Sequence, residues 1–160
     1  MEKIRGFEVC SEYLDKEINL PKRSTERSAG YDFEAAEDTV IESVWKTAFK
    51  EGVKEVKPTL VKTGIKSYMQ ADEALFLYNR SGNPIKKGLV MANSVGVVDS
   101  DYYNNPGNEG VIMFAFYNFF PFDVTIKKGE RIGQGVFSKY LKADEDIAGG
   151  ERIGGFGSTK

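Results

Sequence analysis

Short apolar runs separated by polar turns make up most of this chain. Residues 111–117 are almost entirely apolar, Thr39–Ile41 is a brief β-branched run, and residues 3–9 alternate weakly between apolar and polar positions. Runs of the same kind occupy residues 59–65, 67–70, 74–79, 124–126 and 132–137. Many short strands bounded by turn residues are typical of an all-β sandwich or barrel.

One segment departs from this strand pattern. Apolar residues recur within it at helical spacing, with Lys and Glu between them, at Trp45, Phe49, Val53 and Val56. The spacing predicts an amphipathic helix over residues 45–56, which Pro58 would end. We interpret residues 43–57, approximately, as a helical insertion. Its apolar stripe either packs on its own sandwich or a neighbouring subunit, or forms a surface for a different protein partner.

A second, shorter helix is predicted just after residues 80–82. Asn83 and Pro84 suit the N-cap and the first helical position, and Gly88 suits the residue that follows the helix. Arg80, Ser81 and Gly82 would then lie at a helix N-terminus. Free N–H groups, a hydroxyl and a guanidinium converge there, as an anion requires. The alternative is a capped helix with a surface arginine.

Residues 93–105, with the sequence NSVGVVDSDYYNN, join turn formers to a β-branched run and then to polar residues. We predict a β-hairpin whose tip and second arm carry the polar groups. Asp99 follows the apolar run, so its carboxylate is expected at the edge of a partly buried pocket. Desolvation there would raise the pKa of Asp99 and make it a better proton acceptor. The alternative is an ordinary turn residue.

The absence of histidine excludes more chemistry than any motif adds. With no histidine in 160 residues, the chain has no Ser-His-Asp triad, no Cys-His pair and no HExxH zinc site. Cys10 is the single cysteine, which leaves almost no soft ligands for zinc. A bound metal would therefore be a hard ion held by oxygen, and a general base would be Asp, Glu, Lys or Tyr.

Length and charge narrow the function classes further. A chain of 160 residues is one ordinary domain, and a net charge of -2 offers no basic field to nucleic acid. No apolar run reaches membrane-spanning length, and the first ten residues lack the apolar stretch of a signal peptide. One cysteine cannot form an intrachain disulfide. We expect a cytoplasmic protein that binds neither membrane nor nucleic acid.

Two further residues are candidates for chemistry, each with an alternative. Gln134 lies where a turn runs into a strand, and its amide could donate to a phosphate oxygen or simply face solvent. Asp32 follows Gly30 on a short strand. Its carboxylate could orient a water on a hard metal ion, or pair with a nearby arginine such as Arg23 or Arg27.

The last residues form a distinct segment. From residue 143 the chain is acidic and then glycine-rich, so we divide it into a domain of residues 1–142 and a flexible arm of residues 143–160. Arg152, Ser158 and Thr159 could bind phosphate, and Phe156 could act as a lid that stacks on a base. The alternative is a disordered terminus.

Taken in order, five segments of the chain resemble the homotrimeric dUTP pyrophosphatase (dUTPase) family. They are AGYDF at 29–33, RSG at 80–82, NSVGVVDSDY at 93–102, KGERIGQ at 128–134 and RIGGFGST at 152–159. The resemblance implies a distorted jelly-roll β-sandwich and a homotrimer with shared active sites. It also implies hydrolysis of dUTP to dUMP and pyrophosphate with Mg²⁺, which keeps uracil out of DNA and supplies dUMP for thymidylate synthesis.

The resemblance assigns a role to each candidate residue. It implies that Asp99 activates the attacking water and that Tyr102 packs on the deoxyribose. Asp32 would contact Mg²⁺ only through a water, with no direct protein ligand to the metal. The remaining residues would bind substrate, with the uracil at Asn93 and Val98, the phosphates at Arg80, Ser81, Gly82, Gln134, Arg152, Ser158 and Thr159, and the closing arm contributing Phe156 and Gly157.

The chain also departs from the family pattern. Phe33 replaces a smaller aliphatic residue, residues 103–105 replace a glycine shortly after Tyr102, and the chain ends at Lys160 where a glycine is common. Two rival functions remain open. One is a related dCTP deaminase, and the other is a nucleotide-sensing regulator that binds a repressor or another protein, with the inserted helix as its contact surface.

Overall fold

Short antiparallel strands form the framework of the computed structural model, which describes residues 3–52, 55–150, 152 and 155. Within these residues the strands are β1 (Gly6–Val9), β2 (Lys22–Arg23), β3 (Tyr31–Glu34), β4 (Thr39–Ile41), β5 (Thr59–Lys62), β6 (Ile65–Tyr68), β7 (Glu73–Asn79), β8 (Leu89–Met91), β9 (Gly96–Asp99), β10 (Met113–Asn118), β11 (Val124–Ile126) and β12 (Arg131–Lys139). The helices are α1 (Val44–Ala48) and α2 (Gly82–Lys87), with 3-10 turns η1 (Ser11–Tyr13) and η2 (Ser100–Tyr102).

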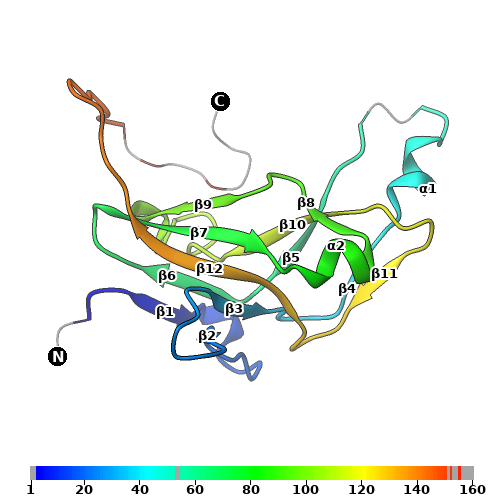
Figure 1. Cartoon of the computed structure of the whole chain (residues 1–160), viewed down its shortest axis with the longest axis horizontal. Coiled ribbons are helices and arrows are strands. Elements are labelled where there is room, and N and C mark those ends of the chain that lie inside the picture. The colour runs from blue at the N-terminus through cyan, green and yellow to red at the C-terminus, as the bar shows by residue number, and fades with distance from the viewer. Residues whose placement is uncertain (1–2, 53–54, 151, 153–154, 156–160) are drawn as a thin grey trace.

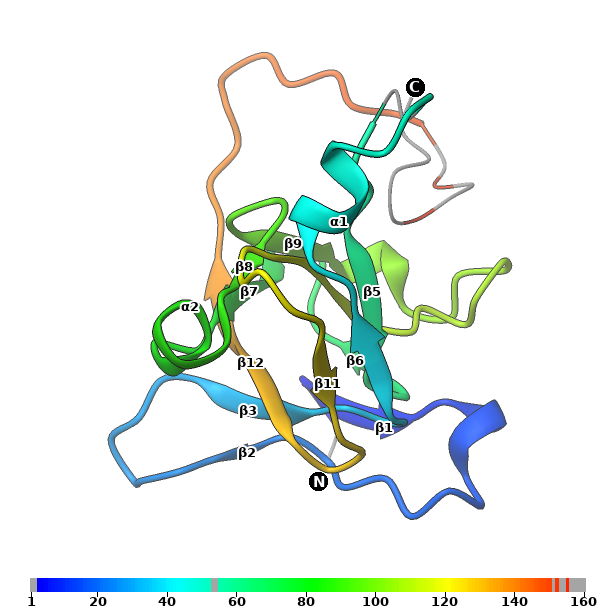
Figure 2. The same cartoon turned by 90° about the vertical axis from the view of Figure 1, so that its right-hand side faces the viewer.

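The strands form antiparallel sheets that pack against one another (Figures 1 and 2). The largest sheet has the order β2-β3-β12-β7-β9, and a second has the order β5-β10-β8. The pairs β1-β6 and β11-β4 complete the arrangement. The predicted all-β architecture is therefore confirmed. In the described residues, no helix has the length and apolar character that a membrane crossing needs.

The core lies between the two larger sheets and is rich in aromatic rings. Phe33 on β3 and Phe114 on β10 are both fully buried, with ring centroids 5.7 Å apart. Glycines on β12 make room for these rings. A Cβ on Gly133 would lie 2.0 Å from Cε1 of Phe114, and a Cβ on Gly135 would lie 2.8 Å from Cε2 of Phe33. Because side chains alternate along a strand, Gln134 between the glycines points away from this core.

The inserted helix is shorter than the predicted 45–56. Ser43 caps α1 by accepting a hydrogen bond from the Trp45 N–H at 3.3 Å, and the helix ends at Ala48, before Gly52 adopts a φ of 80°. Trp45 and Phe49 do form the first part of the predicted stripe, because their rings stack with centroids 6.2 Å apart.

Trp45 and Phe49 do not pack on their own sandwich, which corrects one interpretation of the stripe for these two residues, whereas Val53 lies outside the described residues. The exposed fractions are 48% for Trp45 and 82% for Phe49. The two figures show α1 beyond the ends of β4 and β5, away from the sheets. The indole N–H of Trp45 donates to the Phe119 carbonyl at 2.9 Å, which ties the helix to a neighbouring loop. A neighbouring subunit or another protein remains the predicted partner of this surface.

The predicted hairpin over residues 93–105 is also corrected. β8 pairs with β10, whereas β9 pairs with β7, so the turn at residues 93–95 crosses from one sheet to the other. The turn is tight, since Ser94 has a φ of 59° and the Val95 N–H donates to the Asn93 carbonyl at 2.6 Å. The alternation of apolar residues predicted the strand correctly, but it carried no information about which strand would be its neighbour.

The second helix begins earlier than predicted, with Ser81 rather than Asn83 at the N-cap. Asn83 is 4% exposed, and its amide donates to the Ile132 carbonyl and to Oδ1 of Asn79, both at 2.8 Å. This side chain therefore fastens α2 to β12 and β7. Gly88 follows the helix in the left-handed conformation, as predicted.

An ion pair holds the loop of residues 103–110 against β6 and η1. Nζ of Lys66 lies 2.7 Å from Oε1 of Glu109 and 2.7 Å from Oδ1 of Asn104. Glu109 also accepts a hydrogen bond from the Ser11 N–H at 2.9 Å. Bonds from Lys66 and Ser11 hold the pKa of the Glu109 carboxyl at about 2. The loop is thus fixed from outside by charge rather than by apolar packing.

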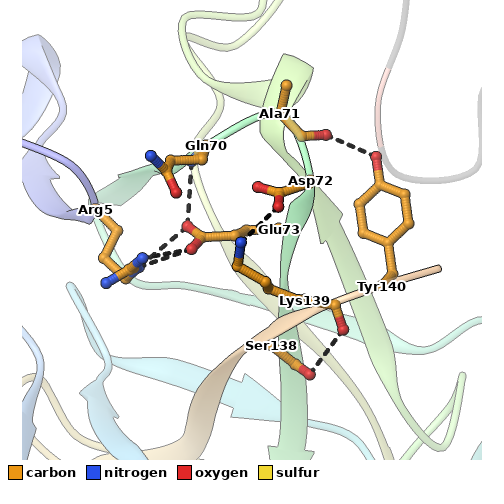
Figure 3. Close-up of polar contacts among 8 residues, drawn as sticks. All are labelled: Arg5, Gln70, Ala71, Asp72, Glu73, Ser138, Lys139 and Tyr140. Carbon is orange, nitrogen blue, oxygen red and sulfur yellow. Dashed lines mark hydrogen bonds and ion pairs between the residues drawn. The ribbon is translucent and has the colours of Figure 1, made fainter.

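The body of the domain ends just after β12, at the contacts in Figure 3. Nζ of Lys139 bonds to Oδ2 of Asp72 at 2.7 Å, and the Tyr140 hydroxyl donates to the Ala71 carbonyl at 2.8 Å. Beyond them the side chain of Leu141 is 97% exposed, and residues 143–150 are all exposed. The predicted boundary between domain and arm, at residues 142 and 143, remains a proposal that this change in burial supports.

We expect Gly133→Ala to destabilise the protein by about 1–3 kcal/mol, because the new methyl group must displace the buried Phe114 ring. Denaturant unfolding at a fixed protein concentration measures the change. Gly150→Ala is the matched control, since nothing lies within 4 Å of a Cβ at that position. Equal midpoints for the two variants would contradict the close approach of β12 to the core.

We expect Glu109→Gln to lower the free energy of unfolding at neutral pH by about 2 kcal/mol. The variant replaces hydrogen bonds to a charged carboxylate, and bonds of this kind contribute about that much to stability. The folded-state pKa of Glu109 is lowered to about 2 from 4.5, so its contribution is present above pH 4.5 and disappears as the pH falls toward 2.

The difference between the parent protein and Glu109→Gln should therefore shrink between pH 4.5 and 2, as urea unfolding at several pH values would measure. Glu12→Gln is the control, because its pairing with Lys16 at 3.9 Å is exposed and such pairs contribute little. A difference that stays constant with pH would contradict this role for the carboxylate.

Candidate active site

Apart from Asn93, the predicted site residues that the structure describes gather in two places. The first, which we call the Arg80 group, lies where β7 ends and α2 begins, and it consists of Asp32, Arg80, Ser81, Gly82 and Gln134. The second, the Asp99 group, lies at the other end of β7, and it consists of Val98, Asp99, Tyr102 and Arg152. Figure 1 shows α2 at one end of β7 and the departure of the arm from the domain near the other.

Asp32 is the centre of charge in the Arg80 group. Its side chain is 17% exposed, and Oδ2 accepts hydrogen bonds from the Ser24 hydroxyl at 2.7 Å and from Nη1 of Arg131 at 3.2 Å. Nε of Arg80 lies 3.9 Å from Oδ1 of the same carboxylate. The expected ion pair exists, but its partners come from β12 and the end of β7 rather than from Arg23 or Arg27.

Gln134 lies directly opposite Asp32 in the pairing of β12 with β3. Its Nε2 is 3.5 Å from the Asn79 carbonyl, a long contact that leaves the amide able to bind another group. Gly30 permits this position, since a Cβ there would lie 2.3 Å from Oε1 of Gln134. The absence of a side chain at Gly30 therefore makes room for the glutamine side chain.

Ser81 and Gly82 complete the first group at the start of α2. Ser81 is exposed and makes no side-chain capping bond, and Gly82 begins the helix. The first N–H groups of a helix are available to an anion. This end of the sheet therefore combines helix N–H groups, two guanidinium groups and one carboxylate.

Asp99 ends β9, and Val98 beside it is 4% exposed and belongs to the core. The Asp99 side chain is 48% exposed, so this chain alone does not provide the burial expected for it. Its carboxylate pairs with the guanidinium of Arg152, which also donates from Nε to Oδ1 of Asp101 at 2.6 Å. In the isolated chain, Arg152 thus forms an ion pair with Asp99, the candidate general base.

Tyr102 lies next to this ion pair in η2 and is 4% exposed. The guanidinium carbon of Arg152 is 5.9 Å from the centre of its ring, and a Cβ on Gly155 would lie 2.7 Å from its Cε2. The arm therefore contacts Tyr102 of its own chain through Arg152 and Gly155. The predicted arm residues Phe156, Gly157, Ser158 and Thr159 lie outside the described residues.

Asn93 is the candidate that joins neither group. It lies in the exposed turn between β8 and β9, and β9 itself is about 10 Å long from Gly96 to Asp99, given a rise of about 3.3 Å per residue. The turn and Asp99 could therefore contact opposite ends of one bound molecule.

The register of the sheet places the two groups far apart within one chain. On β7, Tyr78 pairs with Gln134 on one side, whereas Ala74 pairs with Asp99 on the other. The offset of four residues along β7 corresponds to about 13 Å, and the two strand spacings between β12 and β9 add about 10 Å across the sheet. Gln134 and Asp99 are thus roughly 16 Å apart in the plane of the sheet.

Two residues near the site were not predicted for it. Arg131 was not among the candidates, yet it donates to the Asp32 carboxylate, and Asp101 shares Arg152 with Asp99. A signal for Asp101 was present in the sequence, as an acidic residue two positions after Asp99. No group of three or more acidic, cysteine or histidine residues suited to a metal occurs in the described part of the chain.

Comparison with known proteins identifies a common family. A model of the dUTPase family matches residues 16–159. The chain is 55% identical over 159 residues to the deoxyuridine 5'-triphosphate nucleotidohydrolase of Lactococcus lactis, with 98% of both chains covered. It is 34% identical to the enzyme of the same description from Pectobacterium carotovorum, with 99% of this chain and 97% of the relative covered. The crystal structure of a dUTPase from Streptococcus mutans superposes with a TM-score of 0.76 and 47% identity, over 87% of this chain and 98% of that one.

Proposed function

This chain belongs to the dUTPase family, and from that premise we propose how its own residues act on the substrate. The protein is a deoxyuridine 5'-triphosphate nucleotidohydrolase, which hydrolyses dUTP. In the proposed reaction, water attacks the α-phosphorus, the bond to the bridging oxygen breaks, and dUMP and pyrophosphate leave. The observation that carries this mechanism is the position of Asp99, a half-exposed carboxylate beside the buried Tyr102.

Asp99 is the proposed general base. A water bound to its carboxylate gives up a proton as it attacks, and the chain has no histidine that could take this role. In the isolated chain Arg152 neutralises Asp99. A triphosphate would compete for the guanidinium, because Arg binds phosphate oxygens strongly, and the transfer of Arg152 to phosphate would free Asp99 to accept the proton.

The Arg80 group is the proposed triphosphate site. Arg80, the exposed Ser81 and the first N–H groups of α2 would bind the phosphate chain, and Gln134 would donate to the α-phosphate. Mg²⁺ is the proposed cofactor, and it would neutralise the negative charge of the phosphates. Asp32 is held by Ser24 and Arg131, so its carboxylate fits a contact to metal-bound water better than direct ligation.

The Asp99 group is the proposed nucleoside site. Tyr102 would pack on the deoxyribose and exclude a 2′-hydroxyl, while Asn93 and the backbone near Val98 would bind the uracil. Phe156 would stack over the base, with Gly157, Ser158 and Thr159 closing on the phosphates. The boundaries 1–142 for the domain and 143–160 for the closing arm belong to the same proposal.

We further propose that the active sites form between subunits of a homotrimer. Gln134 and Asp99 must both approach the same α-phosphate, and within one chain they are roughly 16 Å apart in the plane of the sheet. Between them, on the same face, Tyr78 is 38% and Val97 is 59% exposed. A neighbouring chain that covers this face would join its Asp99 group to the Arg80 group of the first.

A second role in binding another protein through α1 stays a prediction. Trp45 and Phe49 remain exposed, and so do Phe119 and Phe122 on the adjacent loop, at 48% and 58%. The exposed rings favour a partner surface at this end of the molecule, either a neighbouring subunit or another protein.

We expect Mg²⁺-dependent release of pyrophosphate from dUTP, with dTTP, dCTP and UTP strongly disfavoured.

Asp99→Asn should lower kcat by about 10²–10⁴-fold while nucleotide binding remains, because the amide cannot accept the proton of water. Pyrophosphate release and calorimetric binding measure the two effects. Asp101→Asn is the matched control, because Asp101 is a neighbouring carboxylate that pairs with the same arginine, Arg152. Comparable kcat values for the two variants would remove Asp99 from the mechanism.

We expect activity to reappear when Asp99→Asn and Arg80→Ala chains are unfolded together and refolded as a mixture. Some mixed trimers would join an intact Asp99 group to an intact Arg80 group. A mixture of Arg80→Ala and Gln134→Ala is the control, because both changes fall in one group and every site would keep one defect. If the first mixture is as inactive as the second, with mixed trimers confirmed by native mass spectrometry, the shared-site proposal is wrong.

A further inference from the structure

The loop of residues 103–110 contacts Tyr102 at the hydroxyl, on the far side of the phenol from the backbone of η2. The Tyr102 hydroxyl donates to the Val111 carbonyl at 3.1 Å and accepts a hydrogen bond from Nδ2 of Asn108 at 2.7 Å. With a donor and an acceptor both engaged, the phenol is held in one position. Burial also raises the pKa of this phenol, which keeps its proton in place at neutral pH.

Asn108 is itself fixed in orientation. Its Oδ1 accepts a hydrogen bond from the Gly110 N–H at 3.1 Å, and its carbonyl accepts one from the Val111 N–H at 3.1 Å. Because Oδ1 is bonded to a backbone N–H, the amide must present Nδ2 to the Tyr102 hydroxyl. The contact with Tyr102 is therefore specified by the backbone of the loop.

The loop that carries Asn108 is fastened at two further points. Gly110 has a φ of 79° and passes so close to Tyr102 that a Cβ on it would lie 2.3 Å from the Tyr102 carbonyl oxygen. Glu109 and Asn104 are bonded to Lys66, as described above. The bond from Asn108 thus connects the phenol to β6 through a rigid loop.

Packing does not provide the same support behind Asn108. A cavity of about 380 Å³ opens there, and its lining includes Pro106, Gly107 and Val111. If the Asn108 side chain were removed, this space would connect to the Tyr102 hydroxyl, and water could replace the lost amide. The ring would then be free to shift by the small distances that decide which substrate fits.

We propose that Asn108 is a positioning residue that sets the discrimination between 2′-deoxyribose and ribose by bracing the Tyr102 ring. This inference rests on the proposed contact of Tyr102 with the sugar. Asn108 does not touch the substrate. It acts by keeping the phenol where a 2′-hydroxyl would collide with it.

The test measures kcat and KM for dUTP and UTP in Asn108→Ala, in Tyr102→Phe and in the double variant. We expect Asn108→Ala to lower the ratio of kcat/KM for dUTP to kcat/KM for UTP by about tenfold. The main change should be a lower KM for UTP, with kcat for dUTP changed less. Tyr102→Phe removes the same contact from the other side and should have a similar effect. The double variant should be no worse than the more severe single variant, because partners in one contact are not additive.

Asn104→Gly is the matched control. It removes an asparagine of the same loop that bonds to Lys66 and not to Tyr102, and glycine suits the φ of 57° at that position. We expect its substrate ratio to equal that of the parent protein, because Glu109 still fastens the loop to Lys66 and Ser11. A reduced ratio in this control would assign the effect to the loop as a whole and overturn the specific role of Asn108.

Tyr102→Ala separates this inference from the proposed function. If Tyr102→Ala abolishes discrimination but Asn108→Ala leaves it within about twofold, the positioning role is wrong and the sugar contact stands. If Tyr102→Ala also keeps the ratio, the proposed role of Tyr102 is wrong. Effects that multiply in the double variant would overturn the shared contact. If Asn108→Ala fails to fold, Tyr102→Phe provides the test. An unchanged ratio of dUTP to UTP kcat/KM in that variant would overturn the positioning role of Asn108 and leave the proposed function standing.

Discussion

The pairing of β7 with β12 on one side and β9 on the other is the constraint on which the site depends. It places the Arg80 group at one end of the strand and the Asp99 group toward the other, because each neighbouring strand has a fixed register against β7. A slip of one residue in either register would turn that strand's core residues toward solvent. The separation of the two groups within one chain is therefore as rigid as the core itself, and it is the basis of the proposal that a neighbouring chain completes each site.

Charge fixes the parts of the site that the core cannot reach. The loop after Tyr102 has few apolar residues, and Lys66 holds it through Glu109 and Asn104. The Asp32 carboxylate similarly collects Arg131 and Ser24 around the end of β7. In both places a single buried or partly buried ion orders several backbone segments, whereas apolar contacts order the sheets behind them.

The sequence predicted best the features that depend on local physics. Alternating apolar residues located the strands, and Gly88 correctly marked the end of α2. The helix over residues 45–56 was too long because Gly52 interrupts it, although the stripe of Trp45 and Phe49 was real. The partner of β9 could not be predicted, since alternation defines a buried face and not the strand that lies beside it. Asn108 gave no signal at all, because its contact with Tyr102 arises only when the loop folds back.

The glycines that flank Gln134 have a consequence for how such proteins are recognised. Gly133 and Gly135 face Phe114 and Phe33, so they are required by the interior of the fold, whereas the glutamine between them points to the opposite face of the sheet, where the nucleotide is proposed to bind. A signature built on this triplet therefore detects the architecture whether or not the chemistry survives. A related protein that had lost hydrolysis and kept another role would still carry both glycines. Its loss of activity would be visible instead as a substitution of Asp99, the proposed general base.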